Sequence, residues 1–189
     1  MTAKDHILNV AFELFLTKGY KVGINEIIEK SKTSKGAFYH HFKSKEQLFT
    51  EAIHQKFFGF IKKFEYLDSS NLDPKEKVLD LVKMVFTPFK NIVNQISSNV
   101  NFLSIFAEYP KIQVLKEKNR STYKEIQALV KNILEEIPNK RNVDIDLLTL
   151  HIVLLIDGAL VDTLILFDNM NEAEKFCLNA VNQLLELLE

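Results

Sequence analysis

Residues 34–42 carry the side chains best suited to binding a charged partner: lysine, hydroxyl, tyrosine and imidazole groups lie close together there. Only Phe38 and Phe42 form an apolar pair at the i, i+4 spacing, so a helix here would bury a narrow stripe. The other side chains would then face outward. A short helix with a thin buried stripe and a cationic outer face suits the major groove of DNA. A solvated surface helix of a helical bundle is the alternative interpretation.

This segment belongs to a longer pattern: Ile7-Leu8, Ala11, Leu14-Phe15, Gly19-Tyr20, Ile27, Ser34-Lys35-Gly36, Tyr39, His41-Phe42, Lys45-Glu46 and Leu48. Through these residues the chain resembles the N-terminal domain of the tetracycline-repressor (TetR) family of transcription regulators. The resemblance covers about the first quarter of the chain, residues 7–49. It implies a homodimeric repressor, without enzymatic activity, cofactor or metal, that a small apolar or amphipathic ligand releases from a pseudo-palindromic double-stranded DNA operator.

The resemblance also implies a set of DNA contacts, namely Ser34, Lys35, Gly36, Tyr39, His40 and Lys45. We add Ala37, on the outward side of the same early turns, and Gly23, which stands where the family commonly has a Thr or Ser cap. Lys35 and Lys45 can neutralise phosphates, and Tyr39 can donate its hydroxyl to one. Residues 1–50 contain no arginine, so any guanine contact would have to use Lys32 or Lys35.

The elements that must position these residues are helices. Five glycines and four prolines among 189 residues favour long helices over an all-β fold, and no strand-like alternation is present. We predict nine helices, with the second and third forming a helix-turn-helix: residues 2–18, 24–30, 34–41, 44–66, 74–96, 100–109, 110–137, 144–167 and 171–189. Capping boxes are predicted at 2–5, 44–47 and 171–174.

Charge is divided unevenly along the chain. Residues 1–50 hold eight lysines against five acids, whereas the remainder holds 16 basic against 20 acidic residues. A basic front and an acidic back suit a DNA-reading head on a body that does not bind DNA. The predicted architecture is therefore all-α with two domains: a helix-turn-helix domain over residues 1–46, and a ligand-binding and dimerisation domain over residues 47–189.

Aromatic and polar residues of the body are candidates for a ligand pocket. Pro88 removes the hydrogen bond to the Met84 carbonyl and is expected to kink the fifth helix, which spoils close packing beside it. The candidates are Met84, Phe86, Phe89, Phe102, Phe106, Tyr109, Tyr123, His151 and Asp157. Core packing is the alternative for the aromatic residues, and exposure on a wet helix face or pairing across an interface is the alternative for His151 and Asp157.

The last two helices are strongly apolar, more so than one internal contact requires, which predicts a two-fold interface between two chains. Gly158 would allow close helix approach. The predicted interface residues are Leu154, Gly158, Val161, Ile165, Val181 and Leu185. Cys177, the only cysteine, is expected to be a small buried residue.

Several other functions remain as alternatives or are disfavoured. A single cysteine allows no intrachain disulfide and favours a reducing compartment, and no run approaches the roughly 18 apolar residues of a membrane span. We therefore expect a cytoplasmic protein without a membrane partner. A DNA-binding regulator controlled by a protein partner, or by no effector, is one alternative. A helical enzyme using His151 and Asp162 is a remote one.

Overall fold

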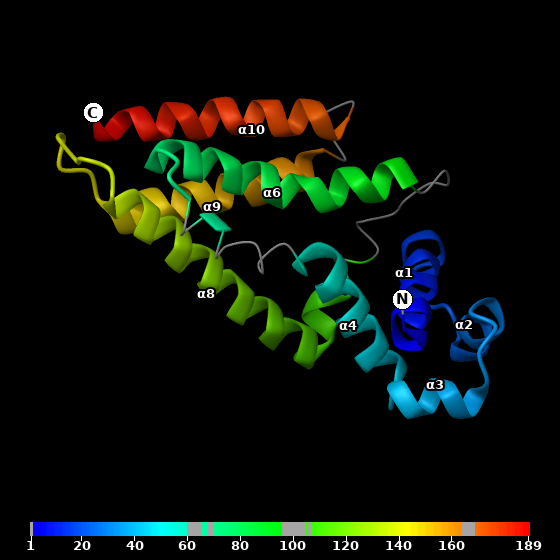
Figure 1. Cartoon of the computed structure of the whole chain (residues 1–189). Coiled ribbons are helices and arrows are strands. Elements are labelled where there is room, and N and C mark those ends of the chain that lie inside the picture. The colour runs from blue at the N-terminus through cyan, green and yellow to red at the C-terminus, as the bar shows by residue number, and fades with distance from the viewer. Residues whose placement is uncertain (1, 60–65, 68–69, 96–104, 106, 164–168) are drawn as a thin grey trace. The chain divides into compact units, whose positions relative to one another are not determined.

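The computed structural model describes residues 2–59, 66–67, 70–95, 105, 107–163 and 169–189 (Figure 1). Over these residues the regular structure is helical, without a strand, which confirms the all-α prediction for this part of the chain. Eight α-helices are present in it: α1 (Ala3–Lys18), α2 (Ile24–Lys30), α3 (Lys35–His41), α4 (Lys45–Phe57), α6 (Pro74–Gln95), α8 (Gln113–Glu135), α9 (Ile145–Asp162) and α10 (Met170–Leu185). Two 3-10 turns accompany them, η2 (Tyr109–Lys111) and η3 (Glu186–Leu188).

Eight of the nine predicted helices correspond to these elements, but the fourth, predicted to run to residue 66, ends at Phe57, because the backbone leaves helical geometry at Phe58. The remaining one, residues 100–109, lies mostly outside the described residues, and its described end, residues 107–109, is not α-helical, so the count of nine is not confirmed. The seventh predicted helix begins later than residue 110, because a 3-10 turn containing Pro110 precedes α8. None of the helices in the described ranges is long and apolar enough to cross a membrane.

Local capping explains where two helices begin. The predicted capping box of α1 is present: Thr2 Oγ1 accepts the Asp5 N–H at 3.1 Å, and the Asp5 carboxylate accepts the Thr2 N–H at 2.9 Å. The box predicted at 171–174 is wrong. Asn169 caps α10 instead, accepting the N–H groups of Asn171 and Glu172 at 3.0 and 3.1 Å. An earlier Asn side chain satisfies the free N–H groups of the first turn equally well.

The chain divides into two compact units. The first unit contains residues 1–59 and 93–120, and the second contains residues 60–92 and 121–189. Each unit therefore combines segments that are distant in sequence. These units are defined by packing, whereas the boundary at residue 46 was predicted from function, so that boundary stays a prediction.

Helix α1 is the centre of the first unit, where it packs against α2 and α4. Phe15 of α1 and Phe49 of α4 are fully buried, with ring centroids 4.9 Å apart and nearly perpendicular rings. Tyr20, just beyond the end of α1, lies equally close to Phe49. This aromatic core holds α1 and α4 together and so provides a fixed base for α2 and α3.

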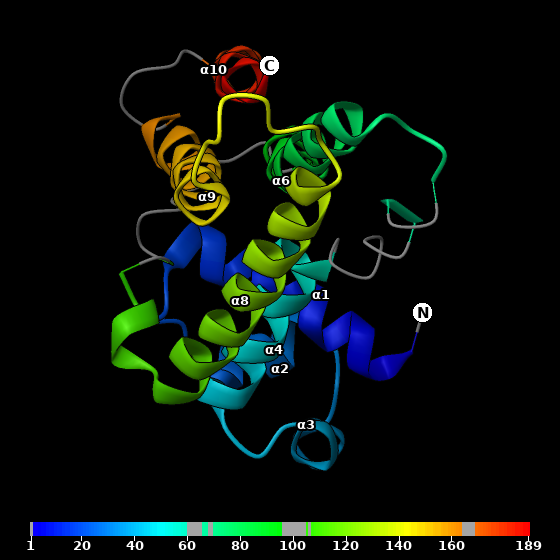
Figure 2. The same ribbon diagram turned by 90° about the vertical axis from the view of Figure 1, so that its left-hand side faces the viewer.

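In the second unit, α6, α9 and α10 lie side by side in both views (Figures 1 and 2). Ion pairs connect neighbouring helices at their edges: Lys90 to Glu174 at 2.7 Å, Lys77 to Glu136 at 3.0 Å and Lys131 to Asp146 at 2.6 Å. Helix α6 continues through Pro88 to Gln95, so the proline does not end the helix. The kink expected there stays a prediction.

Candidate nucleic-acid interface

Helix α3 is fixed in the first unit by the two phenylalanines that the sequence singled out. Phe38 and Phe42 are fully buried, as predicted. Ser34 caps the helix by accepting the Ala37 N–H at 3.0 Å, and the helix ends where the Phe42 N–H donates to the Phe38 carbonyl at 2.9 Å. Both ends and the buried stripe of α3 are therefore defined by its own short sequence.

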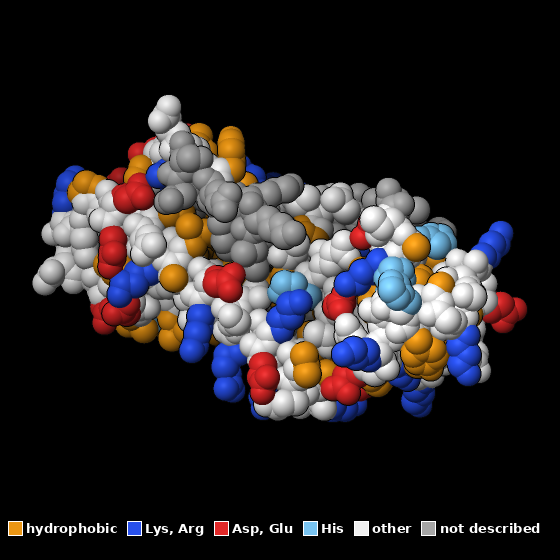
Figure 3. All heavy atoms as spheres, turned by 60° about the horizontal axis from the view of Figure 1, so that its bottom comes forward, with side chains coloured by type: hydrophobic (Ala, Val, Ile, Leu, Met, Phe, Trp, Pro, Cys, Tyr) orange, Lys and Arg blue, Asp and Glu red, His pale blue; other side chains and the backbone are white. Residues whose placement is uncertain are grey.

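The opposite side of α3 is exposed to solvent. Ser34, Lys35, Gly36, Tyr39 and His40 are all exposed, and Tyr39 retains 45% of its accessible surface. Figure 3 shows lysine and histidine side chains close together at the right of the view, with acidic side chains among them. The structure thus brings five of the predicted DNA contacts onto one polar surface, which we call the α3 face. Ala37, a further predicted contact, is half-buried.

The two glycines predicted to contact DNA have open space beside them. A Cβ atom placed on Gly36 would meet only Ser34 Oγ, at 3.9 Å, and one placed on Gly23 would meet nothing within 4 Å. The described residues therefore leave room for a side chain at position 36, and contact of Gly36 with DNA stays a prediction. Gly23 caps α2 without a side-chain hydrogen bond, as the sequence indicated.

Lys45 has a structural role that the sequence did not reveal. Its Nζ donates to the carbonyl of Tyr20 at 2.9 Å and lies 3.4 Å from that of Val22, so it secures the loop between α1 and α2. The ammonium group also lies 4.3 Å from the centroid of the Tyr20 ring, a cation–π contact. An ammonium group has three donors and the two carbonyls use two of them, so one donor remains for a phosphate.

Helix α4 begins next to α3 with a modified cap. Ser44 accepts the Gln47 N–H at 3.0 Å, but the Gln47 side chain accepts from the Lys43 N–H at 2.8 Å and not from Ser44. The predicted box at 44–47 is therefore only half correct. The effect is similar, because Gln47 still satisfies a backbone donor ahead of the helix.

Charged groups on α4 are strongly influenced by their surroundings. Burial opposes ionisation of Glu51, yet hydrogen bonds from Lys4 at 2.7 Å and Gln47 at 2.9 Å bring its pKa below the ordinary value. Burial, assisted by the charge of Lys118, lowers the pKa of His54 to about 4. Glu51 is therefore anionic and His54 neutral at physiological pH.

The predicted pocket residues do not line one described cavity. Phe86 and Phe89 are buried, Met84, Tyr123 and Asp157 are half-buried, and His151 is exposed. For His151 the alternative interpretation, exposure to solvent on the helix surface, is therefore correct. Phe102, Phe106 and the side chain of Tyr109 lie outside the described part of the structure. A hollow of about 350 Å³ in the second unit has a different lining: Asp73, Pro74, Lys75, Glu136, Ile137, Pro138, Lys140 and Glu189.

Asp157 is the most perturbed carboxyl group among the described residues of the second unit. Burial raises its pKa to about 7. Its neighbour across the α9–α10 contact is Cys177, which is buried as predicted. Burial raises the pKa of this thiol to about 12, and the charges of Asp157 and Glu174 add to the effect. The thiol is therefore not a nucleophile, and Asp157 is a polar group between apolar helices.

Helix α9 carries an exposed apolar stripe on one face. Leu147, Leu150, Leu154 and Val161 retain 50, 40, 55 and 41% of their surface. Gly158 is also exposed, and a Cβ atom added to it would meet no atom within 4 Å. Steps of three and four residues place all five on the same side of a helix. We call this set the α9 stripe.

The structure separates the other predicted interface residues from this stripe. Val181 and Leu185 are fully buried inside the chain, so they belong to its core and present no surface to a second subunit. This part of the interface prediction is wrong, because the face of α10 that carries them packs inward. Ile165 lies outside the described ranges.

Titratable side chains on α9 do not form the catalytic pair that the remote alternative requires. His151 and Asp162 lie eleven residues apart on this helix, which corresponds to roughly 16 Å along its axis. That separation is too large for both side chains to act on one reacting atom. Within the described ranges, no cluster of three or more His, Cys, Asp or Glu side chains is arranged to hold a metal ion.

Comparisons with known proteins match the part of the chain that contains the α3 face. The family model described as bacterial regulatory proteins, tetR family, matches residues 7–52. The transcriptional regulator QacR of Staphylococcus aureus is 31% identical over 135 residues, which cover 68% of this chain and 67% of QacR. The match to the family model covers α1, α2, α3 and the first part of α4, including the α3 face.

Solved structures resemble the whole chain. A TetR transcription regulator from Haloarcula marismortui has a TM-score of 0.80 at 14% identity, covering 98% of this chain and 97% of that one. The regulator FadR from Bacillus subtilis, solved in complex with stearoyl-CoA, has a TM-score of 0.67 at 20% identity, covering 97% and 96%. At these identities the two structures establish the likeness of the fold alone.

Proposed function

The chain belongs to the tetR family of bacterial regulatory proteins, DNA-binding regulators of transcription, and we propose that it is a homodimeric repressor that a small ligand releases from a pseudo-palindromic operator. The α3 face is the observation that carries this proposal. Its polar residues project from a seven-residue helix whose position is fixed by Phe38 and Phe42. In a helix-turn-helix this second helix enters the major groove.

The α9 stripe supports the homodimer. Four large aliphatic side chains, each at least 40% exposed, lie on one helix face beside an exposed glycine. Their contact with water costs free energy, and contact with the same stripe of a second chain would remove it. A two-fold arrangement is favoured because one self-complementary patch then serves both subunits. Two heads in one dimer would read two half-sites about one DNA turn apart.

The proposed ligand is apolar or amphipathic. The second unit offers buried Phe86 and Phe89 on α6 for apolar contact and half-buried Asp157 on α9 as a polar group. The fold is shared with FadR, which was solved with stearoyl-CoA, an amphipathic molecule. Control by a protein partner, or by no effector, is the second candidate. In that case the buried apolar residues of the second unit would serve only as its hydrophobic core.

Release follows from a population shift. Only one spacing of the two heads fits consecutive major grooves, so a ligand that binds better to another spacing lowers DNA affinity by its differential binding energy, commonly about 1–3 kcal/mol. Helix α4 begins four residues after α3 ends, so any tilt of α4 moves the α3 face. The action of such a regulator places it in the cytoplasm, where its operator lies.

The proposal is tested by gel shift with the DNA upstream of the protein's own gene. We expect a retarded protein–DNA complex that dissociates when small apolar or amphipathic compounds are added. A complex that no such compound affects would favour the second candidate. If the protein retards no DNA, neither from this region nor from a random-sequence library, the proposed function is wrong.

A further inference from the structure

The lysines of residues 2–59 form two groups, according to whether their side chains contact another part of the chain. Within residues 2–59, Lys4 pairs with Glu51, Lys18 with Glu26, Lys45 binds loop carbonyls and Lys56 lies over the Phe12 ring. The others are exposed, and the described contacts give their side chains no partner: Lys21, Lys30, Lys32, Lys35 and Lys43. Four of these five lie within five residues of an end of α3 or in its first turn.

Lys32 has an unusual backbone conformation. Its φ is +49°, which makes it one of two non-glycine residues with a positive φ among the described residues. Residues other than glycine, asparagine and aspartate disfavour this conformation, because their Cβ atom crowds the following carbonyl. The turn is held by the Lys32 N–H donating to the Glu29 carbonyl at 3.0 Å and the Thr33 N–H donating to the Ile28 carbonyl at 3.2 Å.

A lysine therefore occupies a position where glycine or asparagine would be less strained. Strained residues persist where the surrounding structure enforces them, and they are concentrated at functional sites. Lys32 makes no described side-chain contact that would explain its identity through folding. Its exposed ammonium group is therefore available to a partner outside the chain.

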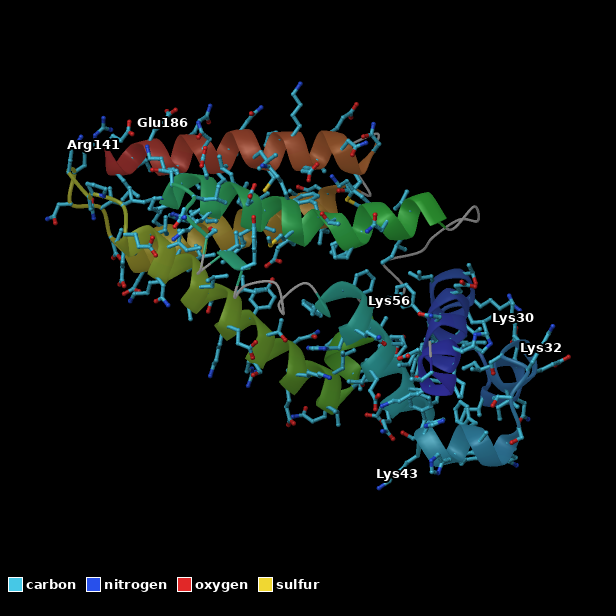
Figure 4. All side chains as sticks on the ribbon, in the orientation of Figure 1. Lys30, Lys32, Lys43, Lys56, Arg141 and Glu186 are labelled. Atoms are coloured by element: carbon cyan, nitrogen blue, oxygen red, sulfur yellow. The ribbon has the colours of Figure 1, made fainter. Side chains whose placement is uncertain are left out.

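The free lysines lie at both ends of α3. Figure 4 shows Lys30 and Lys32 extending from the α2 end and Lys43 extending from the opposite end, with α3 between them. Seven helical residues span about 10 Å, and the major groove is about 12 Å wide. A helix lying in the groove would therefore bring cations at both its ends close to the phosphates that border it.

We propose that Lys32 and Lys43 bind backbone phosphates at the two ends of α3, and that the left-handed turn at Lys32 serves to direct its ammonium group toward the DNA. This inference rests on the proposed DNA-binding function and adds two contacts to it. Phosphate contacts fix the position and orientation of a head on the duplex without reading its sequence. These two would set the depth of α3 in the groove.

The test measures binding and stability together. The probe is a duplex that the wild-type protein selects from a random-sequence library, titrated between 50 and 200 mM KCl. Each lost phosphate contact lowers the slope of log K against log salt by about 0.9, and hence by about 1.8 for two heads. We expect this decrease for Lys32→Asn and for Lys43→Gln. Lys175→Gln, which removes an exposed charge from α10, serves as the control and should keep the wild-type slope.

Thermal unfolding distinguishes a binding role from a structural one. Asparagine accepts the left-handed conformation, so Lys32→Asn should raise Tm by a few degrees while it weakens DNA binding. Lys32→Gly should behave similarly in binding, and Lys43→Gln should leave Tm unchanged. A wild-type slope in either variant, an equal decrease for Lys175→Gln, or a lower Tm for Lys32→Asn would overturn the inference. If the wild-type protein selects no duplex, the proposed function falls with it.

Discussion

Replacing Asp157 by asparagine should stabilise the protein, and more so at pH 8 than at pH 5. Asp157 lies half-buried between α9 and α10, and burial raises its pKa from 3.8 to about 7. Cys177 of α10 is close enough for the charge of Asp157 to raise its pKa, and the nearby Glu174 is paired with Lys90 of α6. Burial alone raises the pKa of Asp157, and no basic side chain lowers it by stabilising the ionised carboxylate.

The sign follows from proton linkage. Because the pKa is higher in the folded than in the unfolded protein, the folded state binds more protons between pH 4 and 7, and stability falls as the pH rises through this window. The penalty grows by about 1.4 kcal/mol per pH unit, or about 2.7 kcal/mol between pH 5 and 7. Partial access to water reduces this to roughly 2 kcal/mol. Above pH 7 the penalty is constant.

The assay is thermal unfolding followed by circular dichroism at pH 5 and pH 8. A difference of roughly 2 kcal/mol corresponds to about 4–8 °C for a chain of this size, so the gain in Tm for Asp157→Asn should be larger at pH 8 by that amount. Asp162→Asn, five residues further along α9, is the matched control. An equal gain at both pH values would show that Asp157 ionises normally and that its burial is not the cause of any stabilisation.

Three further predictions concern binding and assembly. Lys45→Ala should lower operator affinity and destabilise the first unit by roughly 1–3 kcal/mol, because two loop carbonyls lose their charged donor; a salt slope equal to that of the wild type would limit Lys45 to the loop. Gly158→Leu should break the dimer by filling the α9 stripe, which sedimentation would detect, and an intact dimer would count against this interface. Phe89→Ala should reduce the ligand-induced loss of operator affinity more than it changes DNA affinity itself. If that loss is unchanged while Tm falls, Phe89 is core.

Local interactions made much of the first unit predictable. The bounds of α2, the cap of α1 at Thr2 and the buried pair Phe38 and Phe42 follow from residues three or four positions apart, which the sequence displays directly. The α3 face was predictable for the same reason, since most residues outside the narrow apolar stripe face outward, although Ala37 and His41 are half-buried. Such features need no knowledge of what else packs nearby.

Contacts between distant segments could not be predicted in this way. Lys45 uses its ammonium group on carbonyls 23 and 25 residues earlier in the chain, and nothing near Lys45 in the sequence indicates that choice. The backbone at Lys32 is similar: the three polar residues of the turn predict a change of direction, but not which of them takes the left-handed conformation.

The last two helices show the limit most clearly. Leu154 and Val181 both belong to apolar runs with helical spacing, so the sequence by itself treats the two residues alike and favours burial of each. Only the packing of α10 on α9 decided that Val181 lies in the core while Leu154 remains exposed, and that Asp157 is desolvated. The physical reason is that the hydrophobic effect is non-directional. The spacing of apolar residues shows which face of a helix is apolar, but only the folded chain shows which neighbour, if any, covers that face.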